Sequence, residues 1–292
     1  MLTRRSTRSG LTLVEVLIGT VIAAVIGSAT LTLSLHHERL ARALDQRMRT
    51  RRAVREGADA LRYDLRAISP VRRAIYAMSE TSIEVRLTTG FAVLCGIDST
   101  RAIIRVPSRA ASTPSLTSWI VAPEAGDTAM ILSPAADPDS AMWSKAVLAA
   151  PPARGRPCPP AFAQNGDSAA SLAIRLTQPL PPSVGTGAAI RFVRRVRYEL
   201  YRAGDGDWYL GFVDCLAARA TPCAIVQPVA GPYTARGLQF RFLDSAGTPT
   251  ANPVRVRRID VVLRSVGALG KNVPGFSDTI ADSVLFTIVP RD

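Results

Sequence analysis

The chain has 292 residues, 47% of them hydrophobic, which excludes a wholly disordered protein and allows a membrane segment followed by a globular domain. Its net charge of +13 comes almost entirely from arginine, because only Lys145 and Lys271 are lysines. The arginines are scattered along strand-like segments without a zinc finger, recognition helix or ribonucleoprotein motif, so the pattern argues against nucleic acid as a partner.

The chain begins with a short basic stretch and a long apolar run. Residues 1–10 carry three arginines, and residues 16–35 contain no charged side chain. A helix over the apolar run would rise about 30 Å, the thickness of the hydrocarbon core of a bilayer. We therefore expect this run to cross a membrane, and we expect the acid at its edge, Glu15, to have a specific role because a charge there is costly.

Two general interpretations leave Glu15 unexplained. A secretory signal peptide has an apolar region about half as long as this one, although the small residues 27–29 offer a cleavage site. A plain membrane anchor accounts for the length only. The distribution of arginines does not set the orientation of such an anchor, because three precede the run and six follow it within about 20 residues.

A third interpretation explains a glycine and the glutamate together. The stretch GLTLVEVLIG, residues 10–19, resembles the prepilin signal of type IV pilins and type II secretion pseudopilins. In that family a membrane peptidase cuts after the glycine, and the new N-terminal residue is N-methylated. The resemblance implies that Gly10 ends a leader peptide of residues 1–10. It further implies that Leu11, where the family usually has phenylalanine, becomes the methylated N-terminus, and that Glu15 is the family's glutamate.

A physical role for Glu15 follows as a hypothesis. Cleavage would create an α-ammonium at Leu11, and Glu15 could neutralise that ammonium, or one on a neighbouring subunit, inside an apolar helix bundle. A paired charge is tolerable in such surroundings where a lone one is not. Glu15 would then act in assembly and not in catalysis. The alternative is a glutamate whose side chain only reaches the aqueous edge of the membrane.

The helical pattern continues beyond the membrane segment. Apolar residues recur mostly at spacings of three and four, at Leu40, Leu44, Met48, Val54, Leu61, Leu65 and Ile68. Pro70 should stop the helix. We expect one helix from Thr12 to Ile68, with residues 11–35 in the membrane or filament core, residues 36–69 amphipathic, and Gly27 and Gly57 as soft points. Residues 55–70 also resemble the helix end of J-type minor pseudopilins and W-type minor pilins.

The remainder of the chain, residues 70–292, has the pattern of strands and turns. Alternating or short apolar runs occupy residues 82–88, 91–95, 101–106, 171–176, 188–215, 237–244, 254–267 and 282–290. The motif AGDGD divides residues 188–215 into a hairpin. Residues 134–170 are rich in proline, alanine and glycine, so we expect a loop-rich insertion there. The fold class is therefore α+β and pilin-like, with one long N-terminal helix packed on an antiparallel β-sheet domain.

Four cysteines carry the disulfide prediction. They form no CxxC motif, which argues against zinc and thioredoxin-like chemistry, and three pairings are possible outside the cytoplasm. Cys215 and Cys223 flank a short loop and are the first candidate pair. Cys95 and Cys158 would form the second.

The sequence does not predict a catalytic site. His36 and His37, the only histidines, are adjacent, so they cannot face each other on a helix. We expect no enzyme activity, no metal site and no cofactor. One alternative stays open for calcium, because acidic pairs occur at Asp137/Asp139 and Asp205/Asp207. Aspartate is equally an ordinary turn residue.

The resemblance implies a non-catalytic minor pilin or minor pseudopilin. Such a subunit inserts in the bacterial inner membrane with its globular domain outside the cytoplasm, is cleaved and methylated, and then enters or primes a type IV pilus or a type II secretion pseudopilus. Its partners would be other pilin or pseudopilin subunits, a prepilin peptidase, an inner-membrane platform protein and an assembly ATPase. The alternatives are a single-pass membrane enzyme or receptor, and a pilin that takes up DNA.

Overall fold

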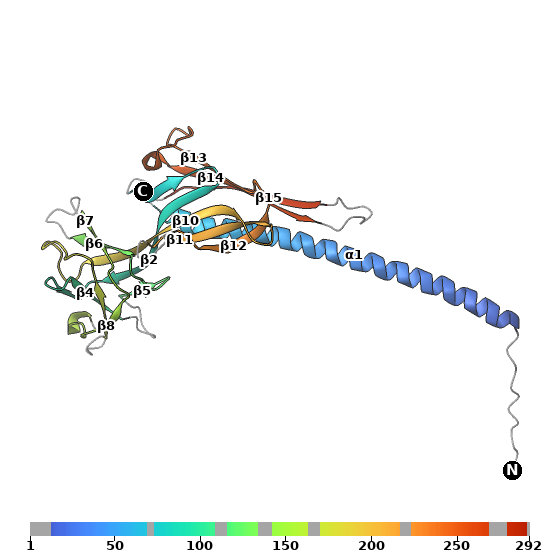
Figure 1. Cartoon of the computed structure of the whole chain (residues 1–292), viewed down its shortest axis with the longest axis horizontal. Helices are drawn as coiled ribbons and strands as arrows, with labels where there is room; N and C mark the ends of the chain where they lie inside the picture. The colour runs from blue at the N-terminus through green and yellow to red at the C-terminus, as the bar shows by residue number, and fades with distance from the viewer. Residues whose placement is uncertain are drawn as a thin grey trace, which may run out of the picture. The chain divides into compact units, whose positions relative to one another are not determined.

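The computed structural model describes residues 13–68, 73–108, 116–133, 142–162, 170–216, 223–268 and 279–290 (Figure 1). The chain divides into two compact units. One unit consists of residues 1–50 and 267–281, and the other of residues 51–266 and 282–292. The boundary at Thr50 falls inside the long helix, so the unit that contains most strands also includes the helix from Arg51 onward.

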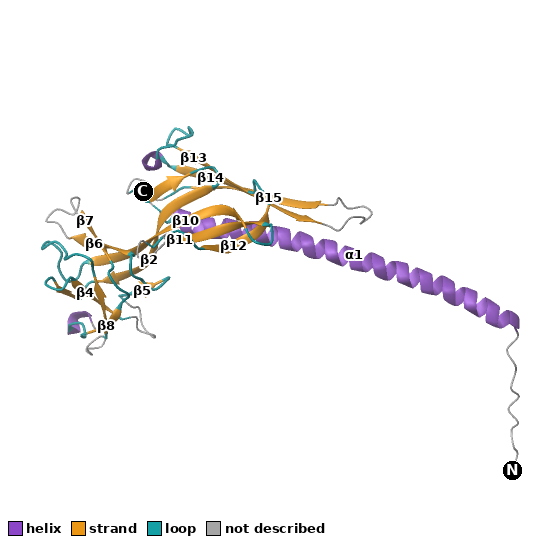
Figure 2. Ribbon diagram, viewed as in Figure 1, coloured by secondary structure: helices purple, strands orange, loops and turns teal. Residues whose placement is uncertain are grey.

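The N-terminal helix α1 (Leu13–Arg66) is continuous over 54 residues, which confirms the single long helix expected from the sequence. It passes unbroken through Gly27 and Gly57, the two expected soft points. Pro70, the predicted stop, lies outside the described residues. Figure 2 shows α1 as the one long purple ribbon in an otherwise strand-rich chain. The α+β class expected from the sequence is therefore confirmed.

The largest sheet has eight antiparallel strands, with β10 as its central strand. Its strands are β1 (Ile75–Met78), β2 (Ser82–Val93), β5 (Ser118–Trp119), β6 (Thr128–Ser133), β7 (Met142–Val147), β10 (Ala189–Arg202), β11 (Trp208–Asp214) and β12 (Val226–Tyr233). The long strand β10 pairs with β2, β6 and β11. The predicted hairpin of residues 188–215 corresponds to β10 and β11, which meet at the pair Arg202 and Trp208.

Two smaller sheets complete the fold. The four-stranded sheet contains β3 (Gly96–Asp98), β4 (Ile103–Pro107), β8 (Ala153–Gly155) and β9 (Ser171–Arg175). The three-stranded sheet contains β13 (Leu238–Leu243), β14 (Arg258–Ala268) and β15 (Thr279–Ile288). Short 3-10 helices lie at Pro160–Phe162 and Pro253–Arg255.

The first hydrophobic core joins the C-terminal part of α1 to the strands. Leu61 and Leu65 are fully buried there, among residues of β2, β10, β11, β13, β14 and β15. Gly57 allows close approach of the helix, because a Cβ at this position would come 3.2 Å from Leu263 Cδ1 and would clash with the hydroxyl of Tyr233. The Tyr233 hydroxyl donates a 2.7 Å hydrogen bond to the carbonyl oxygen of Ala53. The helix from Arg51 onward therefore packs as part of the unit of residues 51–266 and 282–292, which we call the β-rich unit.

The buried face of the helix differs in part from the predicted stripe. Leu44 and Met48 are exposed, whereas Ala43, Thr50 and Ala53 are buried. These three residues follow the same helical spacing as Leu61 and Leu65, but they are small. Small residues do not stand out in a pattern of large apolar side chains, so this part of the buried face is not apparent from the sequence.

The second hydrophobic core lies between the eight-stranded and four-stranded sheets. It contains Phe192, Ile131 and Leu148, together with residues of β4 and β9. The structure therefore differs from the loop-rich insertion expected at residues 134–170, because residues 142–147 form β7 and residues 153–155 form β8. Ala146 is buried in this core, and pairing of β7 with β6 overrides the loop-like composition of the flanking sequence.

Candidate functional site

The residues of the predicted processing site lie at the N-terminal end of α1. Gly10 and Leu11 fall outside the described residues. Glu15 stands in the first turn of α1, where the positive end of the helix dipole favours a carboxylate.

The N-terminal part of α1 presents apolar side chains on all sides. Every described residue from 13 to 39 is exposed, and the large aliphatic ones are Leu13, Val14, Val16, Leu17, Ile18, Val21, Ile22, Val25, Ile26, Leu31, Leu33 and Leu35. In the described part of the chain, α1 is the one helix long and apolar enough to cross a membrane. A helix that is apolar all round requires an apolar environment, either lipid or other helices.

Four hydroxyl side chains of this segment donate hydrogen bonds within the helix. The hydroxyl of Thr20 donates to the carbonyl oxygen of Leu17 at 2.9 Å, and that of Ser28 donates to Val25 at 2.9 Å. Thr30 and Thr32 donate in the same way to carbonyl oxygens three and four residues before them. These internal hydrogen bonds remove most of the cost of placing hydroxyl groups in hydrocarbon.

One face of the segment is made of small residues. Gly19, Ala23 and Gly27 repeat at a spacing of four, which aligns them with Glu15 along the helix. A Cβ built at Gly19 or Gly27 would meet no other atom within 4 Å. Small residues at this spacing are typical of helices that pack closely against other helices in apolar surroundings.

The four described cysteines form two disulfides, the pairs that the sequence analysis favoured. Cys95 bonds to Cys158 across 63 positions, with their Cα atoms 5.5 Å apart. Cys215 bonds to Cys223 across eight positions, with their Cα atoms 4.2 Å apart. The first bond ties the end of β2 to the segment after β8, and the second closes a loop between β11 and β12.

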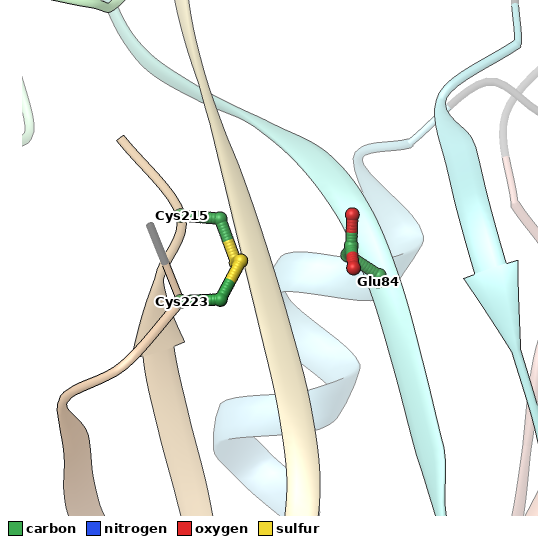
Figure 3. Close-up of side chains that lie close together, drawn as sticks. All are labelled: Glu84, Cys215 and Cys223. Atoms are coloured by element: carbon green, nitrogen blue, oxygen red, sulfur yellow. A yellow bond between two sulfur atoms is a disulfide. The ribbon is translucent and has the colours of Figure 1, made fainter. Parts of the chain in front are cut away.

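The disulfide between Cys215 and Cys223 lies next to the buried carboxylate of Glu84 (Figure 3). A carboxylate oxygen of Glu84, on β2, and the sulfur atoms of Cys215 and Cys223 all lie within 4.8 Å of one another. Metal ions bind thiolate sulfur, and both sulfurs here are held in a disulfide. Glu84 instead accepts a hydrogen bond from Nε of Arg195. With its two cysteines in a disulfide, this group of three residues lacks the thiolate ligands that a metal ion would need.

A buried ionic cluster lies on β10 between the two hydrophobic cores. Arg194 donates two 2.8 Å hydrogen bonds to Asp127, whose side chain is fully buried, and also contacts Asp214 and Glu124 at 3.3 and 3.5 Å. The Asp127 carboxylate raises the pKa of Arg194 further. Two parallel hydrogen bonds from one guanidinium group to one carboxylate fix the relative orientation of the two side chains. Sequence reasoning did not identify this cluster, since its members come from three separate segments.

A second buried polar pair connects α1 to the sheet. The hydroxyl of Tyr198, on β10, donates a hydrogen bond to Asp64 near the end of α1. Burial raises the pKa of Asp64, and this effect outweighs the hydrogen bond, which lowers it. Burial and the nearby Asp64 carboxylate together raise the pKa of Tyr198. The hydrogen bond itself therefore favours the ionised carboxylate of Asp64, whereas burial favours its protonated form and is the larger effect.

The remaining candidate residues have local structural roles. Asp137 and Asp139 lie outside the described residues. Asp205 accepts hydrogen bonds from the backbone N–H of Asp207 at 3.0 Å and from the Tyr209 hydroxyl at 2.8 Å, and these bonds lower its pKa. Its two oxygens thus stabilise the β10–β11 turn. The two adjacent histidines are exposed on α1.

Comparison with known proteins found no matching family model, no similar curated protein and no similar solved structure.

Proposed function

We propose that this protein is a non-catalytic minor pilin or minor pseudopilin. The observation that carries the proposal is the exposed apolar segment of α1, with one acid in its first turn and a prepilin-type sequence over residues 10–19 that includes this acid. Neither a signal peptide nor a plain anchor calls for a glutamate at that position. The match over residues 10–19 supports processing after Gly10 and methylation of Leu11.

The arrangement suggests how one helix serves two environments. In the inner membrane, residues 13–35 are surrounded by lipid, and the hydroxyl groups of Thr20 and Ser28 are satisfied within the helix. In a filament, the same residues pack against the helices of other subunits, with the small face of Gly19, Ala23 and Gly27 allowing close contact. Glu15 pairs with the α-ammonium of a processed subunit, so that neither charge is buried alone.

The β-rich unit provides the part of the subunit outside the cytoplasm. Its two disulfides suit an oxidising compartment. The partners in this proposal are other pilin or pseudopilin subunits, a prepilin peptidase, a platform protein in the inner membrane and an assembly ATPase. The filament would be a type IV pilus or a type II secretion pseudopilus.

Processing of the N-terminus tests this proposal. Membrane-extracted protein from cells that contain a prepilin peptidase should begin at Leu11 and carry one methyl group, as measured by mass spectrometry of its N-terminal peptide. Gly10→Val should remain uncut, because a side chain at the cleaved position obstructs the peptidase. The control variant Gly19→Val, at an open position of α1, should be processed normally. An intact Met1, or a mature chain that begins near Ala29, would contradict the proposal.

A further inference from the structure

The face of the eight-stranded sheet that points away from the first core is strongly basic. Residues on β10 alternate, so Val196 and Tyr198 enter the core and their neighbours point to the opposite face. Five cations lie on that outer face: Arg86, Arg191, Arg195, Arg197 and Lys145. Among the described residues of β2 and β10, the carboxylates on this face are Glu84 and Glu199. The face therefore carries an excess of positive charge.

This basic face contains a cavity of about 410 Å³. Tyr76, Arg86 and Arg195 line one part of it, and the Cys215–Cys223 disulfide lines another. Val147, Val193 and Leu216 add apolar lining. A second, much smaller cavity of about 30 Å³ also has Arg86 and Val193 in its lining. The larger cavity has the size of a typical ligand pocket, with apolar walls and a few charged groups.

Arg195 in the lining of the cavity stacks on an aromatic ring, and so does Arg191, which lines the smaller cavity on the same face. Arg195 lies over the ring of Tyr76 at 4.8 Å from its centroid, and Glu84 accepts a hydrogen bond from its Nε. Arg191 lies 5.5 Å from the ring centroids of both Phe91 and Trp143. Stacking fixes the orientation of a guanidinium fork, so little side-chain entropy is lost when it binds an anion. The Arg195 side chain is nevertheless 51% exposed and accessible to a ligand.

We propose that this cavity binds the carboxylate of an acidic peptide segment from a partner protein. The forks of Arg86 and Arg195 match a carboxylate in geometry and charge. The apolar walls suit the methylene groups of glutamate and of neighbouring side chains. Single-stranded nucleic acid fits less well, because it binds through bases that stack on ring faces, and the guanidinium of Arg195 already covers one face of Tyr76, which lines the cavity. The inference goes beyond the proposed filament function and does not depend on it.

Binding to short labelled peptides tests the proposal on the full-length protein in a neutral detergent. One peptide alternates glutamate with glycine and leucine, a second has glutamine in place of each glutamate, and a third probe is a single-stranded oligothymidine of similar length. Fluorescence anisotropy should show that the glutamate peptide binds at least about tenfold more tightly than the glutamine peptide. Equal affinities for the two peptides would overturn the proposal, and so would tighter binding of the oligothymidine.

Variants of the cavity locate the binding. Arg86→Gln removes one cation, and the double variant Glu84→Gln/Arg195→Gln removes both members of an ion pair, so the net charge is unchanged and the buried Glu84 carboxylate does not lose its partner. Each should weaken binding of the glutamate peptide about tenfold or more. The control Arg236→Gln removes the same charge as Arg86→Gln from an exposed turn and should leave the affinity within about twofold. An equal loss in the control would show a non-specific charge effect and refute the site.

A third variant does not disturb any arginine. Val147 lines the cavity but is 38% exposed, so Val147→Glu should fold normally and place a competing carboxylate beside the two forks. It should reduce peptide affinity about as much as Arg86→Gln. Wild-type affinity in a variant with a wild-type thermal midpoint would rule out the cavity as the binding site.

Discussion

Truncation of Leu61 tests whether the C-terminal part of α1 is a structural member of the β-rich unit. The side chain of Leu61 is fully buried in the first core. Leu61→Ala removes its apolar contacts and leaves a cavity that the surrounding strands cannot close completely. Substitutions of this kind cost about 3 to 5 kcal/mol, which for a unit of this size lowers the midpoint of thermal unfolding by about 10 °C.

Leu44 provides a matched control on the same helix. Its side chain is 53% exposed, so Leu44→Ala should change stability by less than about 0.5 kcal/mol. Tryptophan fluorescence can follow unfolding of the full-length protein in detergent, because Trp208 packs against the first core. Equal midpoint shifts in the two variants would refute the assignment of the buried helix face.

Two further predictions concern the β-rich unit. Cys215→Ser/Cys223→Ser should lower the free energy of unfolding by about 2 kcal/mol, measured by denaturant titration, because the eight-position loop is no longer closed in the unfolded chain. Burial raises the folded-state pKa of Asp64, so its protonated form stabilises the fold, and that stabilisation is lost as the pH rises above about 4 through the raised pKa. Asp64→Asn should therefore gain stability relative to wild type as the pH rises, and parallel pH curves would contradict this.

The elements that are encoded locally were predictable from the sequence. The continuous apolar run and the helical spacing that follows it predicted α1 nearly to its ends. The alternating residues on either side of AGDGD predicted the β10–β11 hairpin. Both patterns depend on neighbours within a few positions, so one sequence is enough to reveal them.

Features that depend on distant contacts were not predictable. The buried helix face includes Ala43 and Ala53, whose importance appears only when the strands that approach them are known. The partners of Arg194 stand 67 and 20 positions away in the sequence. Strand β7 falls in a segment whose composition predicts a loop, because the strand gains its stability from pairing with β6 and from the second core.

Of the two candidate sites, the processing motif is encoded locally, whereas the basic cavity depends on contacts between distant residues. The processing motif around Gly10 and Glu15 is a contiguous sequence pattern, which is why it could be read directly. The alternating arginines of β10, including Arg191 and Arg195, could have signalled a basic sheet face. The other residues of the cavity, such as Tyr76 beside Arg195, come from other strands, so the cavity itself becomes apparent only in the folded chain.

Filament assembly by a Glu15→Gln variant tests whether Glu15 pairs with the α-ammonium of a processed subunit. Glutamine keeps the shape of the side chain and removes its charge, so an α-ammonium buried in the filament core would lose its partner at a cost of several kcal/mol. The variant should still enter the inner membrane and be cleaved, because Gly10 and the apolar run are intact. The measurement is the ratio of protein in sheared filaments to protein in the membrane by immunoblot. We predict that this ratio falls close to zero in the variant, and a ratio equal to that of the wild type would contradict a role of Glu15 in assembly.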